Sequence, residues 1–170
     1  MNKRAFTLVE VLVVVSILGI LVAIVLPMFL GSSVQTKEAA ARDALRIMRS
    51  QIELYRFEHR GLTPGYIKIG SFKTQASTAK LIYQFTGTSS IDGDVVESRT
   101  PAGAYVYGPY IQKLPVNPFN KLSTIKYVAL AVTFPAAADK TTGWLYKKET
   151  AEFKLNWPGT DSEGKAYTDY

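Results

Sequence analysis

The chain has 170 residues, 47% of them hydrophobic, and a formal net charge of +6, a balance that suits a folded domain rather than a disordered chain. Cysteine is absent and histidine occurs once. This excludes disulfide frameworks, cysteine-based zinc sites, cysteine nucleophiles and His-rich metal sites.

Residues 11–30 form an uncharged, largely apolar run behind a short basic start that contains Lys3 and Arg4. Twenty helical residues span about 30 Å, the thickness of a bilayer's hydrocarbon core. The positive-inside rule places the basic end in the cytoplasm and the chain after residue 30 outside it. A cleaved signal peptide would have a shorter apolar core and a small-x-small cleavage site, and a plain membrane anchor leaves Glu10 unexplained.

Glu10 is a carboxylate inside a predicted membrane helix, where such groups cost a few kcal/mol and usually mark function. A cut after Ala5 would create an α-amine on Phe6, about 6 Å along the helix axis from Glu10. In a helical assembly, one subunit's amine then pairs with the next subunit's Glu10, because two opposite charges are buried together more easily than one. The alternative is that Glu10 stays hydrated near the membrane interface.

A short basic leader, then Phe6-Thr7-Leu8-Val9-Glu10, then about twenty apolar residues with Pro27 among them, resembles the type IV pilins and the pseudopilins of type II secretion. The resemblance implies that a prepilin peptidase cuts between Ala5 and Phe6 and methylates Phe6, and that Phe6 and Glu10 direct subunit assembly. The family almost always has Gly before the cut. Here Ala5 takes its place, so we expect slower or tolerated processing.

Gly19 and Pro27 interrupt the apolar run. Proline removes a backbone donor and glycine is permissive, so the helix can bend or unwind between them. The resemblance implies that this stretch melts when subunits pack in a filament. The alternative is that both residues are ordinary, because they are common in membrane helices.

The helix is expected to continue from residue 6 to about residue 59. An apolar stripe with helical spacing supports this extension; its members are Ala41, Leu45, Met48, Ile52 and Tyr55. Three charged pairs at helix spacing add support: Glu38 with Arg42, Asp43 with Arg46, and Arg49 with Glu53. Gly61 is a natural C-terminal cap, and Pro64 prevents continuation.

Residues 61–170 are predicted to form a small globular head. We predict a short helix over residues 73–85 packed through Ala79, Ile82 and Tyr83, loops around residues 87–94, and a proline-fixed connection over residues 108–120. Residues 124–132 are rich in β-branched and aromatic side chains, and residues 143–147 and 151–156 flank a predicted hairpin turn at 148–150. We expect three antiparallel strands to cover the apolar stripe, with Phe153 and Leu155 facing inward and Asn156 outward.

These elements predict an α+β, pilin-like fold: a long N-terminal α-helix, half membrane and half amphipathic, packed on a small antiparallel β-sheet. The expected parts are a leader peptide (1–5), a transmembrane and filament-core helix (6–30), the amphipathic half of the same helix (31–60), and a globular head (61–170). The stretch from Gly108-Pro109-Tyr110 to Asn117-Pro118, followed by the Gly143-Trp144-Leu145-Tyr146 hairpin, resembles pseudopilin heads.

The resemblance also implies a candidate calcium site in the C-terminal loop. Many adhesive pilins close a C-terminal loop with a disulfide, whereas major pseudopilins often hold it with calcium. No cofactor is required, but Asp161, Ser162, Glu163 and Asp169 are candidate calcium ligands because calcium prefers oxygen. No EF-hand spacing is present, so the alternative is a solvated tail.

Candidate catalytic groups are few, and we expect no enzyme. His59 lies at a predicted helix end, where we expect a solvated cation. No phosphate loop, nucleotide fingerprint or catalytic serine elbow occurs. The lysines look scattered rather than clustered, so nucleic-acid binding is not expected.

We therefore expect a structural subunit that waits in the inner membrane with its N-terminus cytoplasmic and its head periplasmic. After cleavage it would polymerise by self-association into a periplasmic pseudopilus for type II secretion. The implied partners are the prepilin peptidase, an inner-membrane assembly platform and other pseudopilins. The alternatives are a pilin for adhesion, motility or DNA uptake, and a membrane-anchored periplasmic binding domain that never polymerises.

Overall fold

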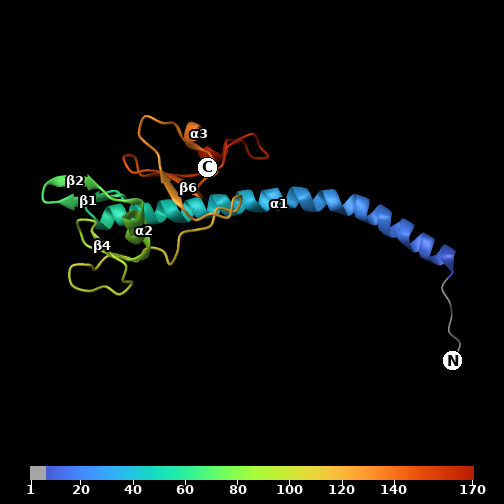
Figure 1. Ribbon diagram of the computed structural model, residues 1–170, viewed down its shortest axis with the longest axis horizontal. Coiled ribbons are helices and arrows are strands. Elements are labelled where there is room, and N and C mark those ends of the chain that lie inside the picture. Colours follow the sequence, from blue (N-terminus) through green and yellow to red (C-terminus); the bar gives the residue numbers. More distant parts are fainter. Residues whose placement is uncertain (1–6) are drawn as a thin grey trace, which may run out of the picture. The chain divides into compact units, whose positions relative to one another are not determined.

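The computed structural model describes residues 7–170, and for residues 26–33 it describes the helical backbone alone. The chain divides into two compact units, one ending at Lys37 and the other comprising Glu38–Tyr170, which we call the head. Helix α1 (Leu8–Glu58) contributes to both units (Figure 1). The predicted long helix is thus confirmed over the described residues.

The apolar stripe of α1 forms the floor of the head. Its five members are at most 1% exposed: Ala41, Leu45, Met48, Ile52 and Tyr55. The opposite side of the helix keeps Ile47, Leu54 and Phe57 exposed. The helix ends as expected, because Arg60 and Gly61 both take positive φ and the Gly61 N–H donates to the Arg56 carbonyl at 2.7 Å.

None of the three ion pairs predicted along α1, Asp43 with Arg46 included, forms among the described residues. Arg42 bonds Asp161 at 2.8 Å instead of Glu38, and Arg49 donates to the backbone carbonyls of Phe153 and Tyr170. Within this half of the helix the structure shows one pair, Glu53 with Arg56 at 2.8 Å. An exposed ion pair within a helix stabilises it by only about 0.2–0.5 kcal/mol. Arg42 and Arg49 therefore bind groups from distant parts of the chain that the fold holds next to them.

The segment after α1 forms two small hairpin sheets around a helix. Strands β1 (Tyr66–Ile69) and β2 (Phe72–Gln75) pair antiparallel, as do β3 (Thr88–Ser89) and β4 (Val95–Val96). Helix α2 (Thr78–Thr86) lies between the two hairpins in the chain.

The helix predicted over residues 73–85 is therefore shorter at its start. Ser77 caps α2 by accepting from the Lys80 N–H at 3.3 Å, and the residues before it belong to β2. Ala79 is exposed and Ile82 is half-buried against the core, while Leu81, Gln84 and Phe85 are the buried residues of α2.

The C-terminal sheet is mixed rather than wholly antiparallel. Strands β6 (Trp144–Lys147) and β7 (Glu152–Leu155) form the predicted antiparallel hairpin, but β5 (Ile125–Tyr127) pairs parallel to β6. The connection between β5 and β6, which includes helix α3 (Phe134–Ala137), is long enough for the crossover that a parallel pair requires. The short 3-10 helix η1 (Tyr167–Asp169) follows β7.

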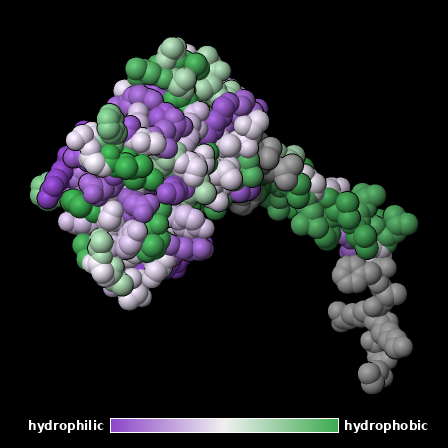
Figure 2. Space-filling model, turned by 60° about the vertical axis from the view of Figure 1, so that its left-hand side comes forward, coloured by the Kyte–Doolittle hydropathy of each residue, from purple (hydrophilic) through white to green (hydrophobic). Residues whose placement is uncertain are grey.

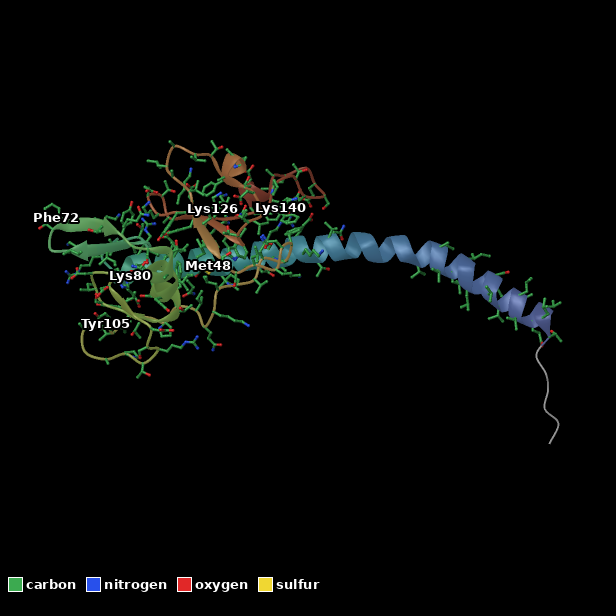
Figure 3. The ribbon with its side chains drawn as sticks, viewed as in Figure 1. Met48, Phe72, Lys80, Tyr105, Lys126 and Lys140 are labelled. Carbon is green, nitrogen blue, oxygen red and sulfur yellow. The ribbon has the colours of Figure 1, made fainter. Side chains whose placement is uncertain are left out.

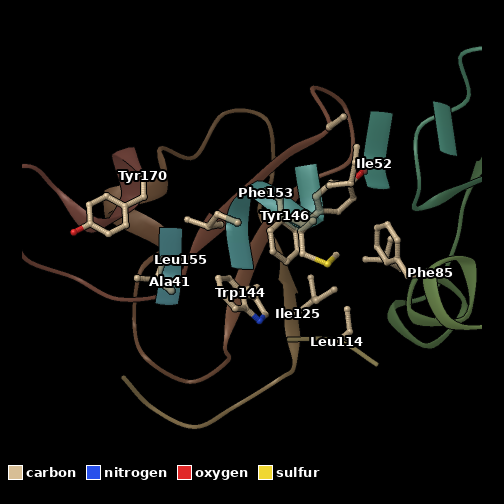
Figure 4. Packing of buried hydrophobic residues seen from close by; sticks show 14 of the residues in the cluster. Ala41, Ile52, Phe85, Leu114, Ile125, Trp144, Tyr146, Phe153, Leu155 and Tyr170 are labelled. Atoms are coloured by element: carbon tan, nitrogen blue, oxygen red, sulfur yellow. The ribbon is translucent and has the colours of Figure 1, made fainter. Parts of the chain in front are cut away.

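This sheet packs on the buried stripe of α1 to form the core (Figure 4). Trp144, Tyr146, Phe153 and Leu155 have no exposed surface. The polar atoms of the two largest side chains find backbone partners, because Trp144 Nε1 donates to the Pro115 carbonyl at 2.8 Å and the Tyr146 hydroxyl to the Pro64 carbonyl at 2.9 Å. Burial of such aromatic side chains supplies most of the stabilisation of a small head.

Asn156 contradicts the alternation predicted for the last strand, because it is completely buried. Its Oδ1 accepts the N–H groups of Asp139 and Lys140 at 2.8 and 3.1 Å, and its Nδ2 donates to Asp139 Oδ1 and Thr142 Oγ1 at 3.0 and 2.8 Å. The side chain is buried since it satisfies the turn that leads into β6.

Candidate assembly site

The N-terminus of α1 is closed by a capping box. The Thr7 N–H and hydroxyl donate to Glu10 Oε2 at 2.9 and 2.8 Å, and the Glu10 N–H donates to Thr7 Oγ1 at 3.3 Å. These bonds satisfy backbone donors that a helix start leaves free. The Thr-x-x-Glu spacing of Thr7 and Glu10 is the sequence signal that indicates this cap.

The surface of α1 beyond Glu10 is apolar and uncovered. Residues 8–25 are all exposed, and Leu8–Val25 is long and apolar enough to cross a membrane by length and composition. In Figure 2 these side chains form a continuous hydrophobic surface along the helix. Such a surface in water is not stable on its own, so lipid or other apolar helices have to cover it.

Gly19 and Pro27 both lie within the unbroken helix. A Cβ added at Gly19 would meet no atom within 4 Å, so packing inside the chain does not require glycine there. Ser16 donates to the Leu12 carbonyl at 2.8 Å, which satisfies its hydroxyl without a partner helix. The flexibility expected between Gly19 and Pro27 stays a prediction, and the cleavage-site residues Ala5 and Phe6 lie outside the described residues.

In the head, the candidate calcium ligand Asp161 is already saturated by protein donors. Its Oδ2 accepts from Arg42 Nη2 and the Tyr170 hydroxyl, both at 2.8 Å, and its Oδ1 accepts the N–H groups of Glu163 and Lys165 at 2.9 and 2.8 Å. Although burial opposes the charge, these bonds lower the pKa of Asp161 to about 2.

The other candidate ligands do not join Asp161. Ser162 bonds Glu38 through its N–H and hydroxyl at 3.2 and 3.1 Å, while Glu163 and Asp169 are exposed. Within residues 7–170, no three His, Cys, Asp or Glu side chains gather as a metal site would require. The residues do not fit calcium in this arrangement, and calcium binding stays a prediction. What the structure shows is a C-terminal segment fastened to α1 by Glu38 and Arg42.

His59 is not the solvated cation that its place at the helix end predicted. It is 2% exposed, stacks on Tyr55 with ring centroids 3.8 Å apart, and contacts Tyr107 at 5.0 Å. Nδ1 lies 2.9 Å from the Tyr55 carbonyl and Nε2 lies 3.0 Å from Ser89 Oγ. Burial lowers the pKa of His59 against the opposing effects of the Tyr55 carbonyl and Glu58. Its surroundings are those of a core residue.

Two comparisons with known proteins found a similarity. Residues 1–26 match the family model of the prokaryotic N-terminal methylation motif. The chain is also 32% identical over 76 residues to the ComG operon protein 3 homolog of Bacillus licheniformis, an alignment that covers 40% of this chain and 78% of that protein. No solved structure matches the chain. The methylation motif, the exposed apolar helix and this relative agree, and the chain belongs to the type IV pilin-like family.

Proposed function

We propose that the protein is a pseudopilin that polymerises, after removal of residues 1–5, into a filament serving type II protein secretion. The observation that carries polymerisation is the uncovered apolar surface of residues 8–25 with a single carboxylate, Glu10, near its start. A membrane anchor needs the apolar surface alone. A carboxylate at the centre of a membrane helix costs about 2.5–3.5 kcal/mol even on the lenient insertion scale, and charged groups inside such helices usually mark function, so the presence of Glu10 favours a second environment.

The second environment is a neighbouring subunit. The capping box with Thr7 satisfies one oxygen of Glu10, which makes the carboxylate tolerable in the single chain. In the filament, the α-amine of a neighbour's Phe6 would add a full positive charge. Because lipid is as apolar as the helices, packing and this ion pair have to supply the specificity of assembly.

Secretion is the finer part of the proposal. It is supported by a head that contains no cysteine and therefore cannot close its C-terminal loop with a disulfide. Instead, Arg42 and Glu38 of α1 hold that loop through contacts with Asp161 and Ser162. Lys3 and Arg4 support a cytoplasmic N-terminus and a periplasmic head.

A second candidate function is a pilin for adhesion, motility or DNA uptake. The observation in its favour is that the similar protein from Bacillus licheniformis is named as a ComG operon protein and not as a secretion protein. Long purified filaments, or loss of DNA uptake with intact protein secretion in a deletion strain, would favour this candidate.

The decisive experiment combines N-terminal mass spectrometry with one substitution in the native host. We expect a mature N-terminus at methylated Phe6 and filaments that disappear in Glu10→Leu while the protein remains in the membrane. Glu97→Leu, at an exposed position in the head, is the matched control and should leave filaments intact. An intact Met1 together with filaments in Glu10→Leu would refute polymerisation by this route and leave a tethered binding domain.

A further inference from the structure

The hairpin β1–β2 has one free edge. The two strands form a sheet of their own, and the four residues of β2 are all exposed. The Ala76 N–H donates to the Gly65 carbonyl at 2.8 Å. This bond shows which residue pairs of the hairpin are hydrogen-bonded to each other and which are not. Since bonded and non-bonded pairs alternate in an antiparallel sheet, the pairs Tyr66–Gln75 and Lys68–Lys73 direct their backbone groups outward.

The outer edges of β1 and β2 differ in whether their backbone groups have partners. On β1, the outward Lys68 N–H donates to the Asp92 carbonyl at 2.7 Å. On β2, the outward groups of Lys73 and Gln75 have no backbone partner within residues 7–170. An unpaired edge of this kind is a template on which an extended peptide can add as a further strand.

One face of the hairpin is cationic. Lys68 and Lys73 stand directly opposite each other, an arrangement of like charges that destabilises a strand pair. Together with Arg60 they line a hollow of about 200 Å³, to which Asp92 contributes the one carboxylate. Among residues 7–170, no ion pair joins Arg60, Lys68 or Lys73 to an acid. Lys73 Nζ lies 3.8 Å from the centroid of the Tyr66 ring, and Glu149 attracts it without forming an ion pair. The face therefore carries cations that have no ion-paired carboxylate among the described residues.

The other face of the hairpin is apolar at its tip. Ile69 and Phe72 are paired across the strands and are 64% and 77% exposed. Phe72 projects from the end of the hairpin away from the core (Figure 3). Because side chains alternate along a strand, a peptide added at the edge of β2 would present every second residue to the cations and the others to Ile69 and Phe72.

We propose that the edge of β2 binds an extended segment of a partner protein in which acidic and apolar residues alternate. The acidic side chains would lie next to Lys73 on β2, with Lys68 across the strand pair on the same face, and the apolar ones would cover the tip. A nucleic acid fits less well, because it needs a cationic track along its backbone, and here the cations surround one small hollow. The proposal does not depend on the filament function.

The test uses the full chain in a non-ionic detergent and a fluorescent probe of about eight alternating Glu and Val residues, which has the pattern that a strand added here requires. We expect binding that high salt weakens, and no binding of the matching Lys–Val peptide. The double variant Lys68→Gln/Lys73→Gln should lower the affinity about tenfold or more, whereas Lys113→Gln/Lys121→Gln, which removes the same charge from exposed positions, should not.

A second variant separates strand addition from simple charge attraction. Gln75→Pro removes an outward N–H without removing a bond of the hairpin and keeps every cation. It should also weaken the probe about tenfold while the melting temperature of the head stays unchanged. Equal binding of both peptides, wild-type affinity in Gln75→Pro, or tighter binding of an oligothymidylate than of the acidic probe would overturn the proposal.

Discussion

His59 is the single histidine of the chain, and its side chain is almost completely buried. Its Nδ1 faces the Tyr55 carbonyl, so this nitrogen carries the proton, and Nε2 faces Ser89 Oγ. Around the ring stand Tyr55, Tyr107 and Tyr110. A second proton would place a charge inside this aromatic cluster.

The stability of the head should therefore fall below neutral pH. The folded-state pKa of His59 is lowered from an unfolded value near 6.5, so the unfolded chain binds the proton more readily. The free energy of unfolding therefore keeps the full contribution of neutral His59 above about pH 7, and it decreases as the pH drops through about 6.5. Denaturant unfolding at pH 7 and pH 5.5 measures this. His59→Phe keeps a stacking ring but cannot take up a proton, so its free energy of unfolding should change less between pH 7 and pH 5.5 than that of the wild type. An equal change in both proteins would show that His59 is not the group responsible.

At the scale of elements, α1 is a helix with two faces inside the head. Met48 is completely buried in the core that Figure 4 shows, whereas its neighbour Ile47 is 55% exposed. Truncating a buried long side chain leaves a cavity and costs about 2–5 kcal/mol. Surface changes usually stay within about 0.5 kcal/mol.

We accordingly expect Met48→Ala to lower the free energy of unfolding of the head by about 2–5 kcal/mol, and Ile47→Ala to change it by less than about 0.5 kcal/mol. Chemical denaturation of the full chain in detergent, followed by the fluorescence of the two tryptophans of the head, Trp144 and Trp157, compares the two. Similar losses for both variants would mean that the face carrying Ile47 is also packed.

The sequence allowed those parts of the fold to be predicted that depend on local periodicity. The stripe ending at Tyr55 and the β6–β7 hairpin follow from spacing, and both are confirmed. The parallel pairing of β5 was missed because it depends on a crossover of residues 128–143 and not on the strand itself.

Partners distant in sequence could not be predicted for the same reason. His59 and Asn156 were expected to be solvated, yet both are buried by segments that arrive from elsewhere in the chain. For the assembly site, the apolar run and Glu10 were evident from spacing. The cationic face of β1–β2 was not, because Arg60, Lys68 and Lys73 look scattered until the hairpin brings them to one hollow.

At the scale of the whole molecule, the chain's last segment returns to its first helix. Arg42 and Asp161 are separated by 119 positions in sequence, and Tyr170 lies against both, with its ring centroid 4.5 Å from the Arg42 guanidinium and its hydroxyl on Asp161. In the absence of a disulfide, this contact holds the C-terminal segment on the head.

We therefore expect Asp161→Asn to lower the melting temperature of the head by several degrees, because Arg42 loses its anionic partner while the backbone N–H groups keep an oxygen to bond. Since the pKa of Asp161 is lowered to about 2, its contribution is present above an unfolded pKa near 3.9 and is lost as pH falls toward 2. The difference between wild type and Asp161→Asn should thus be full at pH 6 and shrink toward pH 2. Asp169→Asn, exposed in η1, is the control. A pH-independent difference would show that shape, not charge, holds the segment in place.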